Sequence, residues 1–164
     1  MSAPFTIERV KEILHVVKDP EIPVISLEEL GVLRHVAVDG DRITVTITPT
    51  YSGCPAMTEM ENDIIRVLRE NGAANVEVKT VLSPAWTTDW IPDEAKEKLR
   101  DYGIHPPESE SVDKAALLGK VRQLKCPRCG SDNTIMKSQF GSTACKALFQ
   151  CQDCLEPFDY FKCI

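Results

Sequence analysis

Two cysteine pairs near the C-terminal end constrain this chain more than any other feature. Cys126 and Cys129 are two residues apart, Cys151 and Cys154 repeat that spacing, and 21 residues lie between the pairs. Each pair forms a tight turn that directs two thiolates to one metal ion, and Gly130 suits such a turn. The spacing predicts a four-cysteine site of the zinc-ribbon kind. Zinc is favoured over iron, which the spacing also permits, and the alternative is two disulfides or redox dithiols.

Length and cysteine content narrow the class of protein. The chain has 164 residues, of which 43% are hydrophobic, enough for one core and a small metal-stabilised module. Its first residues lack a basic region followed by an apolar run, and no segment approaches the roughly 20 apolar residues that span a bilayer. Seven cysteines with metal-type spacing indicate a reducing compartment. We therefore expect a cytoplasmic protein with no membrane partner.

The net charge of −6 is unevenly distributed along the chain. Residues 1–119 hold 12 Lys and Arg against 21 Asp and Glu, whereas residues 120–164 hold 7 against 4. Zinc bound by four thiolates would reduce the charge of this C-terminal part from +3 to about +1. That charge is too small for a phosphate-binding surface, so we expect no nucleic-acid partner.

The hydrophobic pattern before residue 105 predicts a second, larger domain. Apolar residues recur at helical spacing in two long segments and alternate with polar residues in three others. The order helix, hairpin, helix, strand predicts an α+β fold in which helices cover a small mixed sheet, with the zinc-ribbon module following at the C-terminal end. The expected helices run from the N-cap Thr6 to the stop at Asp19-Pro20, from Pro55 to Asn71-Gly72, and over 93–102; the expected strands are 32–38, 42–48 and 76–82.

A capping box is expected between the first helix and the first strand. Ser26 and Glu29 have the spacing at which each side chain bonds the other residue's backbone N–H group, and Gly31 suits the end of a single helical turn. Further along, the segment that begins at His105 has the proline and serine content of a linker. The predicted domains are therefore 1–104 and a zinc ribbon over 120–164, joined by a linker over 105–119.

Cys54 is the most informative single residue of the first domain. It ends the segment Thr48-Pro49-Thr50-Tyr51-Ser52-Gly53-Cys54, between a predicted strand and a predicted helix. Backbone N–H groups at a helix start have no intrahelical partner, so we expect the thiolate to be favoured there. Cys54 is then a metal ligand or a nucleophile, and the alternative is a small apolar side chain in the core.

Two carboxylates and two further thiols complete the candidate residues. Asp19 and Glu21 flank a proline in a restrained loop, where they either cap backbone amides or supply oxygen ligands to a metal. Cys145 and Cys163 exceed the four ligands that a zinc ribbon needs. Either of them replaces one ligand or remains a free thiol beside the site.

Several motifs resemble known families. The segment Asp19-Pro20-Glu21-Ile22-Pro23, the pair Leu30-Gly31 and the segment from Thr48 to Pro55 resemble the SufT-like family of iron-sulfur assembly proteins, across about residues 6–90. The segment 83–90 (SPAWTTDW), the segment 140–148 (FGSTACKAL) and the cysteine pairs resemble the PaaD family of phenylacetate-degradation proteins. This second resemblance covers nearly the whole chain.

The resemblance implies a role beside the multicomponent phenylacetyl-CoA epoxidase, which combines a di-iron oxygenase with an iron-sulfur flavin reductase. It implies a non-catalytic maturation factor that delivers iron or an iron-sulfur cluster to one of these components. Cys54 would be the sulfur ligand, with Asp19 and Glu21 beside it and zinc in the ribbon. A cluster normally takes four ligands, so a homodimer, the ribbon or the client would supply the rest. The alternatives are a docking or adaptor subunit without cluster handling, and a Cys54-dependent thioester enzyme.

Overall fold

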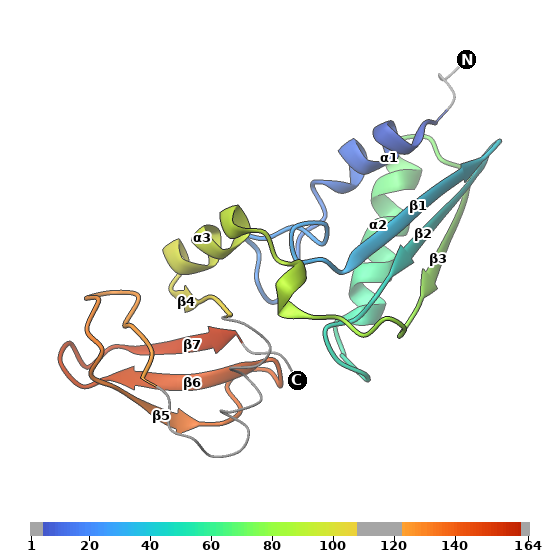
Figure 1. Cartoon of the computed structure of the whole chain (residues 1–164). Helices are drawn as coiled ribbons and strands as arrows, with labels where there is room; N and C mark the ends of the chain where they lie inside the picture. The colour runs from blue at the N-terminus through green and yellow to red at the C-terminus, as the bar shows by residue number, and fades with distance from the viewer. Residues whose placement is uncertain (1–4, 108–122, 162–164) are drawn as a thin grey trace. The chain divides into compact units, whose positions relative to one another are not determined.

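The computed structural model describes residues 5–107 and 123–161 (Figure 1). The chain forms two compact units, Met1–Trp86 and Thr87–Ile164. Residues 108–119 of the expected linker lie outside the described residues, and the expected domain bounds stay a prediction.

A three-stranded mixed sheet forms the centre of the first unit. Strand β1 (Leu33–Asp39) pairs antiparallel with β2 (Arg42–Ile47), and β2 pairs parallel with β3 (Asn75–Thr80). The spatial order is β1-β2-β3. The three predicted strands are therefore confirmed to within two residues at each end.

Two helices cover this sheet, as Figure 1 shows: α1 (Ile7–Leu14) and α2 (Met57–Glu70). The hydroxyl of Thr6 accepts a hydrogen bond from the backbone N–H of Arg9 at 3.2 Å, so Thr6 is the N-cap that the sequence predicts. Helix α1 ends earlier than its hydrophobic pattern. The chain turns after Leu14, and Val17 is still buried because the turn directs it inward.

The covered face of the sheet is the one that alternation predicts. Val36 lies opposite Val45 across the β1–β2 ladder, and Val38 lies opposite Ile43. Ile43, Val45 and Ile47 are completely buried, whereas Val38 is half-buried near the hairpin turn. Period-two alternation therefore identified the core-facing residues of both strands.

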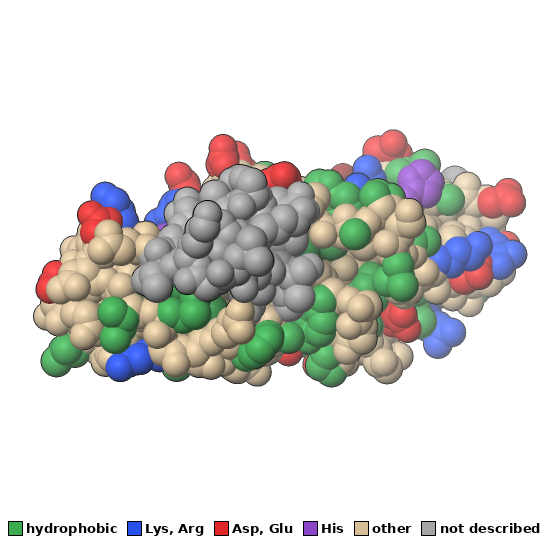
Figure 2. Space-filling view, turned by 60° about the horizontal axis from the view of Figure 1, so that its bottom comes forward, with side chains coloured by type: hydrophobic (Ala, Val, Ile, Leu, Met, Phe, Trp, Pro, Cys, Tyr) green, Lys and Arg blue, Asp and Glu red, His purple; other side chains and the backbone are tan. Residues whose placement is uncertain are grey.

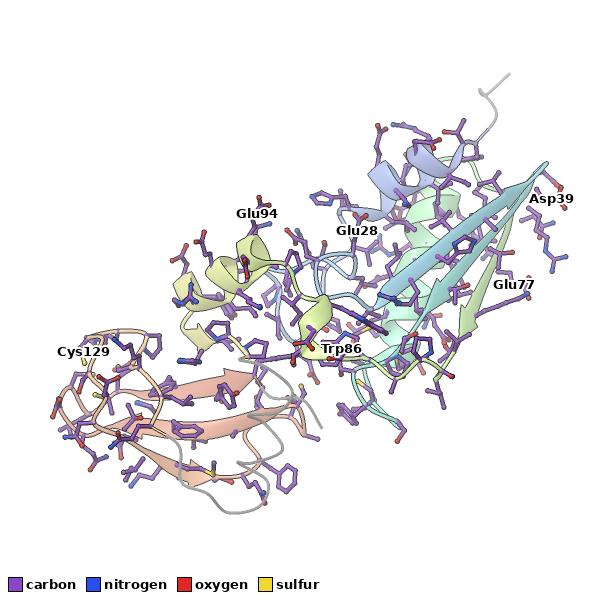
Figure 3. The ribbon with its side chains drawn as sticks, viewed as in Figure 1. Glu28, Asp39, Glu77, Trp86, Glu94 and Cys129 are labelled. Carbon is purple, nitrogen blue, oxygen red and sulfur yellow. The ribbon has the colours of Figure 1, made fainter. Side chains whose placement is uncertain are left out.

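The loop between α1 and β1 is fixed by the predicted capping box. The backbone N–H of Ser26 donates to Glu29 Oε2 at 2.9 Å, and the backbone N–H of Glu29 donates to Ser26 Oγ at 3.2 Å. Leu30 N–H then bonds the Ser26 carbonyl at 2.9 Å, and Gly31, with φ +78°, ends this single turn. The buried indole of Trp86 adds a hydrogen bond to the carbonyl of Leu30 at 2.9 Å (Figure 3).

The second unit is built on a four-stranded sheet. Its strands are β4 (Ile104–His105), β5 (Thr134–Ser138), β6 (Lys146–Cys151) and β7 (Pro157–Phe161). Their spatial order is β4-β7-β6-β5; β4 pairs parallel with β7, and the other two pairs are antiparallel. Helix α3 (Asp93–Asp101), which the sequence predicts, precedes β4, and a 3-10 turn (Thr88–Trp90) precedes α3.

This second sheet has an aromatic core of its own. The rings of Phe149 and Phe158 stack with centroids 5.8 Å apart, and Tyr160 meets Phe149 edge-on at 5.9 Å. Leu124 and Ala147 are buried in the same cluster, next to Cys126 and Cys151. The metal-site cysteines are thus anchored to the core of this unit.

The surface carries charges of both signs. On the face drawn in Figure 2, acidic and basic side chains of the described residues lie interspersed among hydrophobic and neutral ones. No helix within residues 5–107 and 123–161 has the length and apolar character that a membrane crossing requires.

Candidate metal centre and thiol site

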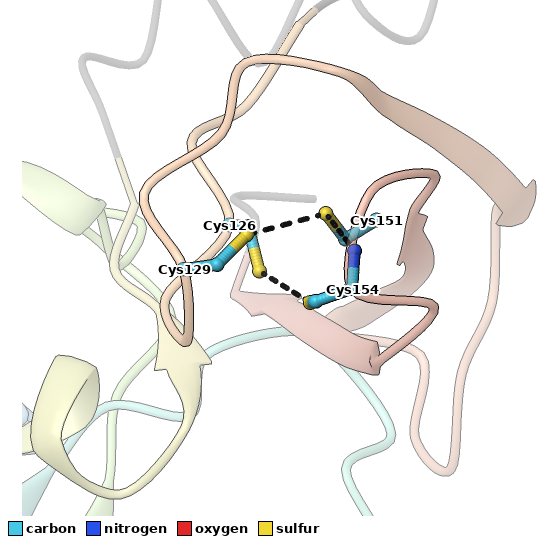
Figure 4. Close-up of side chains that lie close together, drawn as sticks. All are labelled: Cys126, Cys129, Cys151 and Cys154. Carbon is cyan, nitrogen blue, oxygen red and sulfur yellow. Dashed lines mark hydrogen bonds between the residues drawn. The ribbon is translucent and has the colours of Figure 1, made fainter.

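The four cysteines of the two pairs converge in the second unit (Figure 4). Their Sγ atoms all lie within 4.8 Å of one another. The Sγ atoms of Cys126 and Cys154 are 3.7 Å apart, and those of Cys129 and Cys151 are 3.5 Å apart. Tetrahedral zinc with Zn–S bonds of about 2.3 Å places its sulfurs about 3.8 Å apart, whereas a disulfide needs about 2.05 Å. The donor set therefore fits a metal ion and not two disulfides.

Each pair occupies a turn whose backbone supports the sulfurs. In the first pair, the N–H of Gly130 bonds the carbonyl of Cys126 at 2.9 Å, with Gly130 at φ +74° as the sequence predicts. In the second pair, the N–H of Cys154 donates to Cys151 Sγ at 3.5 Å. This bond is the main reason that the pKa of Cys151 is lowered, to about 7. A lowered pKa favours the thiolate that a metal binds.

Cys129 shows why such a cluster needs a cation. The backbone N–H of Ser131 stabilises its thiolate, yet the neighbouring thiols and burial outweigh that bond and raise the pKa of Cys129 to about 12. Four sulfurs this close cannot all ionise without a positive charge between them. A divalent metal held by Cys126, Cys129, Cys151 and Cys154 would supply that charge.

Polar side chains tie the loop of the first cysteine pair to the loop of the second. Arg128 forms an ion pair with Glu156. Ser131 donates to one carboxylate oxygen of Asp153, and Asn133 Nδ2 donates to the other at 2.8 Å. These bonds hold the two loops in the relative position that the four sulfurs require.

The two surplus cysteines have different positions. Cys145 is buried immediately before β6, and its Sγ lies 3.1 Å from the hydroxyl of Thr143. It is outside the group of four converging thiols, which is complete without it. Cys163 lies outside the described residues.

Cys54 lies in the first unit, just before α2. The helix begins at Met57 with Ala56 as its N-cap, so Cys54 is two residues before the cap and not at it. Its side chain is 9% exposed. Burial raises the pKa of the Cys54 thiol, and hydrogen bonds from the Ala56 backbone and the Tyr51 side chain offset this only in part. The expectation that the helix start favours a Cys54 thiolate is therefore wrong, because desolvation outweighs the backbone N–H groups.

The structure brings two distant carboxylates toward this thiol. After burial, Glu21 and then Asp19 are the charges that raise the pKa of Cys54, so both lie within electrostatic reach of it. Asp19 is 6% exposed, and its Oδ1 accepts hydrogen bonds from the N–H groups of Glu21 and Ile22, each at 2.8 Å. Asp19 thus caps the loop, which is the commoner of the two roles that the sequence allows.

The burial of Cys54 and its two neighbouring carboxylates disfavour a free thiolate and favour the binding of a cation. A buried thiol beside two carboxylates keeps its proton, but an arriving metal ion would displace that proton and be attracted by the carboxylates. Thiolate and carboxylate groups are both metal ligands in proteins. The three side chains are therefore candidate ligands for a metal ion.

Two residues of the segment that ends at Cys54 were not singled out from the sequence. Tyr51 bonds the thiol through its side chain. Thr48 is 1% exposed, and its hydroxyl is the buried side-chain oxygen that has no hydrogen-bond partner within the described part of the chain. Both belong to the segment that ends at Cys54, so their place in that motif was the available signal.

Comparisons with known proteins agree with this two-unit arrangement. Residues 7–80 match the model of an iron-sulfur cluster assembly protein family, and residues 110–162 match that of the PaaD zinc beta ribbon domain. An Escherichia coli (strain K12) protein, named as a putative subunit of 1,2-phenylacetyl-CoA epoxidase, is 48% identical over 99% of this chain and 96% of its own length.

Two further relatives resemble the first part of the chain. A Porphyromonas gingivalis protein named "Fe-S protein maturation auxiliary factor" is 34% identical over 57% of this chain and 90% of its own length. The crystal structure of a domain of unknown function, DUF59, from Bacillus anthracis matches with a TM-score of 0.54 and 28% identity. That match covers 57% of this chain and 90% of the solved one.

Proposed function

This chain belongs to the PaaD family, and from that premise we propose that it is a non-catalytic maturation factor of a multicomponent phenylacetyl-CoA epoxidase. It assists the delivery of iron or an iron-sulfur cluster to the reductase or to the di-iron oxygenase component. The names of the two relatives, an epoxidase subunit and an iron-sulfur maturation factor, support this combination of roles.

The observation that carries the proposal is the placement of Cys54 near Glu21 and Asp19. The buried thiol stays protonated until a cation arrives, which suits a ligand that takes up and releases a metal. A cysteine nucleophile needs the opposite, a lowered pKa or an adjacent base. No histidine or lysine is among the groups that shift the pKa of Cys54 most, so cargo binding is favoured over thioester chemistry.

The ribbon has a separate, structural role. Cys126, Cys129, Cys151 and Cys154 would hold zinc with all four positions filled by protein, which leaves no open position for substrate. Zinc bound there contributes to the folding of the second unit. The cargo site and the zinc site are therefore different sites.

Cys54 alone does not complete the ligand set of a cluster. One thiol and two carboxylates leave ligands to be supplied from outside the loop, because a cluster normally takes four. A second copy of the chain or the client protein would supply them. The transfer of cargo then follows when client ligands replace those of the donor.

The test is metal analysis of the protein purified without oxygen. Zinc, iron and sulfide per chain are measured for the wild type, for Cys54→Ser and for the control Cys145→Ser, which replaces another buried thiol outside the cluster of four. We expect zinc in all three proteins, and iron with sulfide or iron alone in the wild type and the control only. Cells that carry Cys54→Ser should also show reduced epoxidase activity.

Two outcomes would contradict this function. If all three proteins contain zinc alone and Cys54→Ser cells keep normal epoxidase activity, the chain is a docking or adaptor subunit that carries no cargo. If the purified protein hydrolyses acyl-CoA thioesters and Cys54→Ser does not, it is an enzyme.

A further inference from the structure

A groove in the second unit lies directly beside the cysteine cluster. It has a volume of about 720 Å³ and is lined by residues of α3, of β4 and of the loop of the first cysteine pair. A volume of this order is within the range of specific ligand sites, about 300–1,000 Å³. Its lining includes Lys96 and Arg100 of α3, His105 of β4, Pro106, Pro107, and Lys125, Pro127 and Asp132 of the loop.

The described side chains of the lining include three cations and one carboxylate, and Cys126 of the cysteine cluster also lines the groove. Lys96 and Arg100 are four residues apart and so share one face of α3, while Lys125 faces the same groove from the loop. Asp132 is the one carboxylate among the described residues of the lining. Among the described side chains, neither Arg100 nor Lys125 forms an ion pair, and Lys96 contacts only Asp93, at 3.5 Å. Asp93 is 99% exposed, so this contact neutralises little of the charge.

Three prolines and a packed histidine ring give the groove a rigid and partly apolar wall. Pro106, Pro107 and Pro127 contribute rigid apolar surfaces. The ring of His105 packs edge-on against Tyr160 at 5.5 Å, and its Nδ1 lies 2.9 Å from the carbonyl of Pro106. Such a surface is formed before any ligand arrives, which reduces the entropic cost of binding.

These features favour a peptide over a small anion. Sites for free phosphate usually use the N–H groups of a helix N-terminus, whereas α3 contributes Arg100 from its last turn, where the helix dipole is negative. The cations come from two separate elements and are combined with three prolines. An extended segment with acidic and aliphatic side chains could satisfy both parts of the lining at once.

We propose that this groove docks an acidic segment of a partner polypeptide beside the cysteine cluster. Its carboxylates pair with Lys96, Arg100 and Lys125, and its aliphatic side chains pack on the prolines. Complementary charges at an interface favour the matching partner and select against others, so three cations in one groove select for an acidic segment. The proposal extends beyond cargo delivery and does not depend on the role of Cys54.

The experiment measures binding of a labelled peptide to the zinc-loaded full chain by fluorescence anisotropy. The probe is a short peptide in which Glu and Asp alternate with Leu, and its counterpart has Gln and Asn instead. We expect saturable binding of the acidic peptide only. Arg100→Glu and Lys125→Glu should each weaken it about tenfold or more, since like charges are then opposed.

Lys98→Glu is the matched control. Lys98 is in the same last turn of α3, so its replacement has the same effect on the helix dipole, but it does not line the groove. We expect a change of less than about twofold, and zinc content confirms that each variant retains its fold. Equal loss of binding in Lys98→Glu, or saturable binding of neither peptide, would overturn the proposal. Displacement of the peptide by an equal concentration of inorganic pyrophosphate would assign the groove to small anions instead.

Discussion

Replacement of Asp19 tests whether its carboxylate holds the loop that carries Glu21. Asp19 is almost completely buried and accepts two backbone hydrogen bonds at 2.8 Å, from Glu21 and Ile22. Asp19→Ala removes both bonds and leaves the buried N–H of Ile22 without its partner. We expect a large loss of stability in the unit Met1–Trp86.

The magnitude follows from these two bonds. Hydrogen bonds to a charged group contribute about 1.5–3 kcal/mol each. The bond from Ile22 is buried and counts in full, whereas the bond from Glu21 is partly buried and water replaces part of it. Asp19→Ala should therefore lower the free energy of unfolding by about 2–4 kcal/mol, and Asp19→Asn, which keeps a neutral acceptor, by about 1–2 kcal/mol.

Hydrogen exchange in increasing urea, followed by mass spectrometry on peptides from β1 and β2, measures the stability of this unit separately. Asp41→Ala is the control, because Asp41 is an exposed aspartate in the hairpin turn, and its loss should change stability by less than about 0.5 kcal/mol. If Asp19→Ala and Asp41→Ala had equal effects, the two backbone bonds would not hold this loop.

Further predictions concern Cys54 and the cysteine cluster. Glu21→Gln should lower the pKa of Cys54, which is measured as the pH dependence of its alkylation by iodoacetamide. Glu70→Gln, at the far end of α2, is the control. If both variants shifted the pKa equally, Glu21 would not be the carboxylate that raises it. Because the folded unit keeps a Cys54 proton that the unfolded chain releases near pH 9, its free energy of unfolding should fall as the pH rises through about 9, less so in Cys54→Ala. Chelation of zinc should abolish the protection of backbone amides from hydrogen exchange in β5, β6 and β7, but not in β1, β2 and β3. If β6 stayed protected in the metal-free protein, the metal would not be structural.

Local patterns predicted the elements in which neighbouring residues cooperate. The Ser26–Glu29 capping box and the β1–β2 hairpin both depend on contacts within a few residues or across one turn, and both are confirmed. The four-cysteine cluster was predictable for a similar reason, because each pair is a local turn and a metal ion requires the two turns to meet.

Other features depended on contacts between distant segments. The hydrophobic period continues to Val17, but α1 ends at Leu14. A turn after the helix buries Val17 as well, so its burial does not require a longer helix. The pKa of Cys54 depends on its burial and on Glu21, more than thirty residues away in the sequence, so the helix-start argument gave the wrong direction. Sequence spacing alone does not reveal which distant loops lie close together.

The two-residue strand β4 limits where the ribbon can be cut from the rest of the chain. Its pairing with β7 covers one edge of the second sheet, with α3 immediately before it in the chain. A ribbon excised at residue 120 would leave β7 with an open edge, which invites pairing with other chains. A fragment that begins at Thr87 keeps this edge strand and its helix, so the fragment expected to fold alone extends well beyond the cysteines.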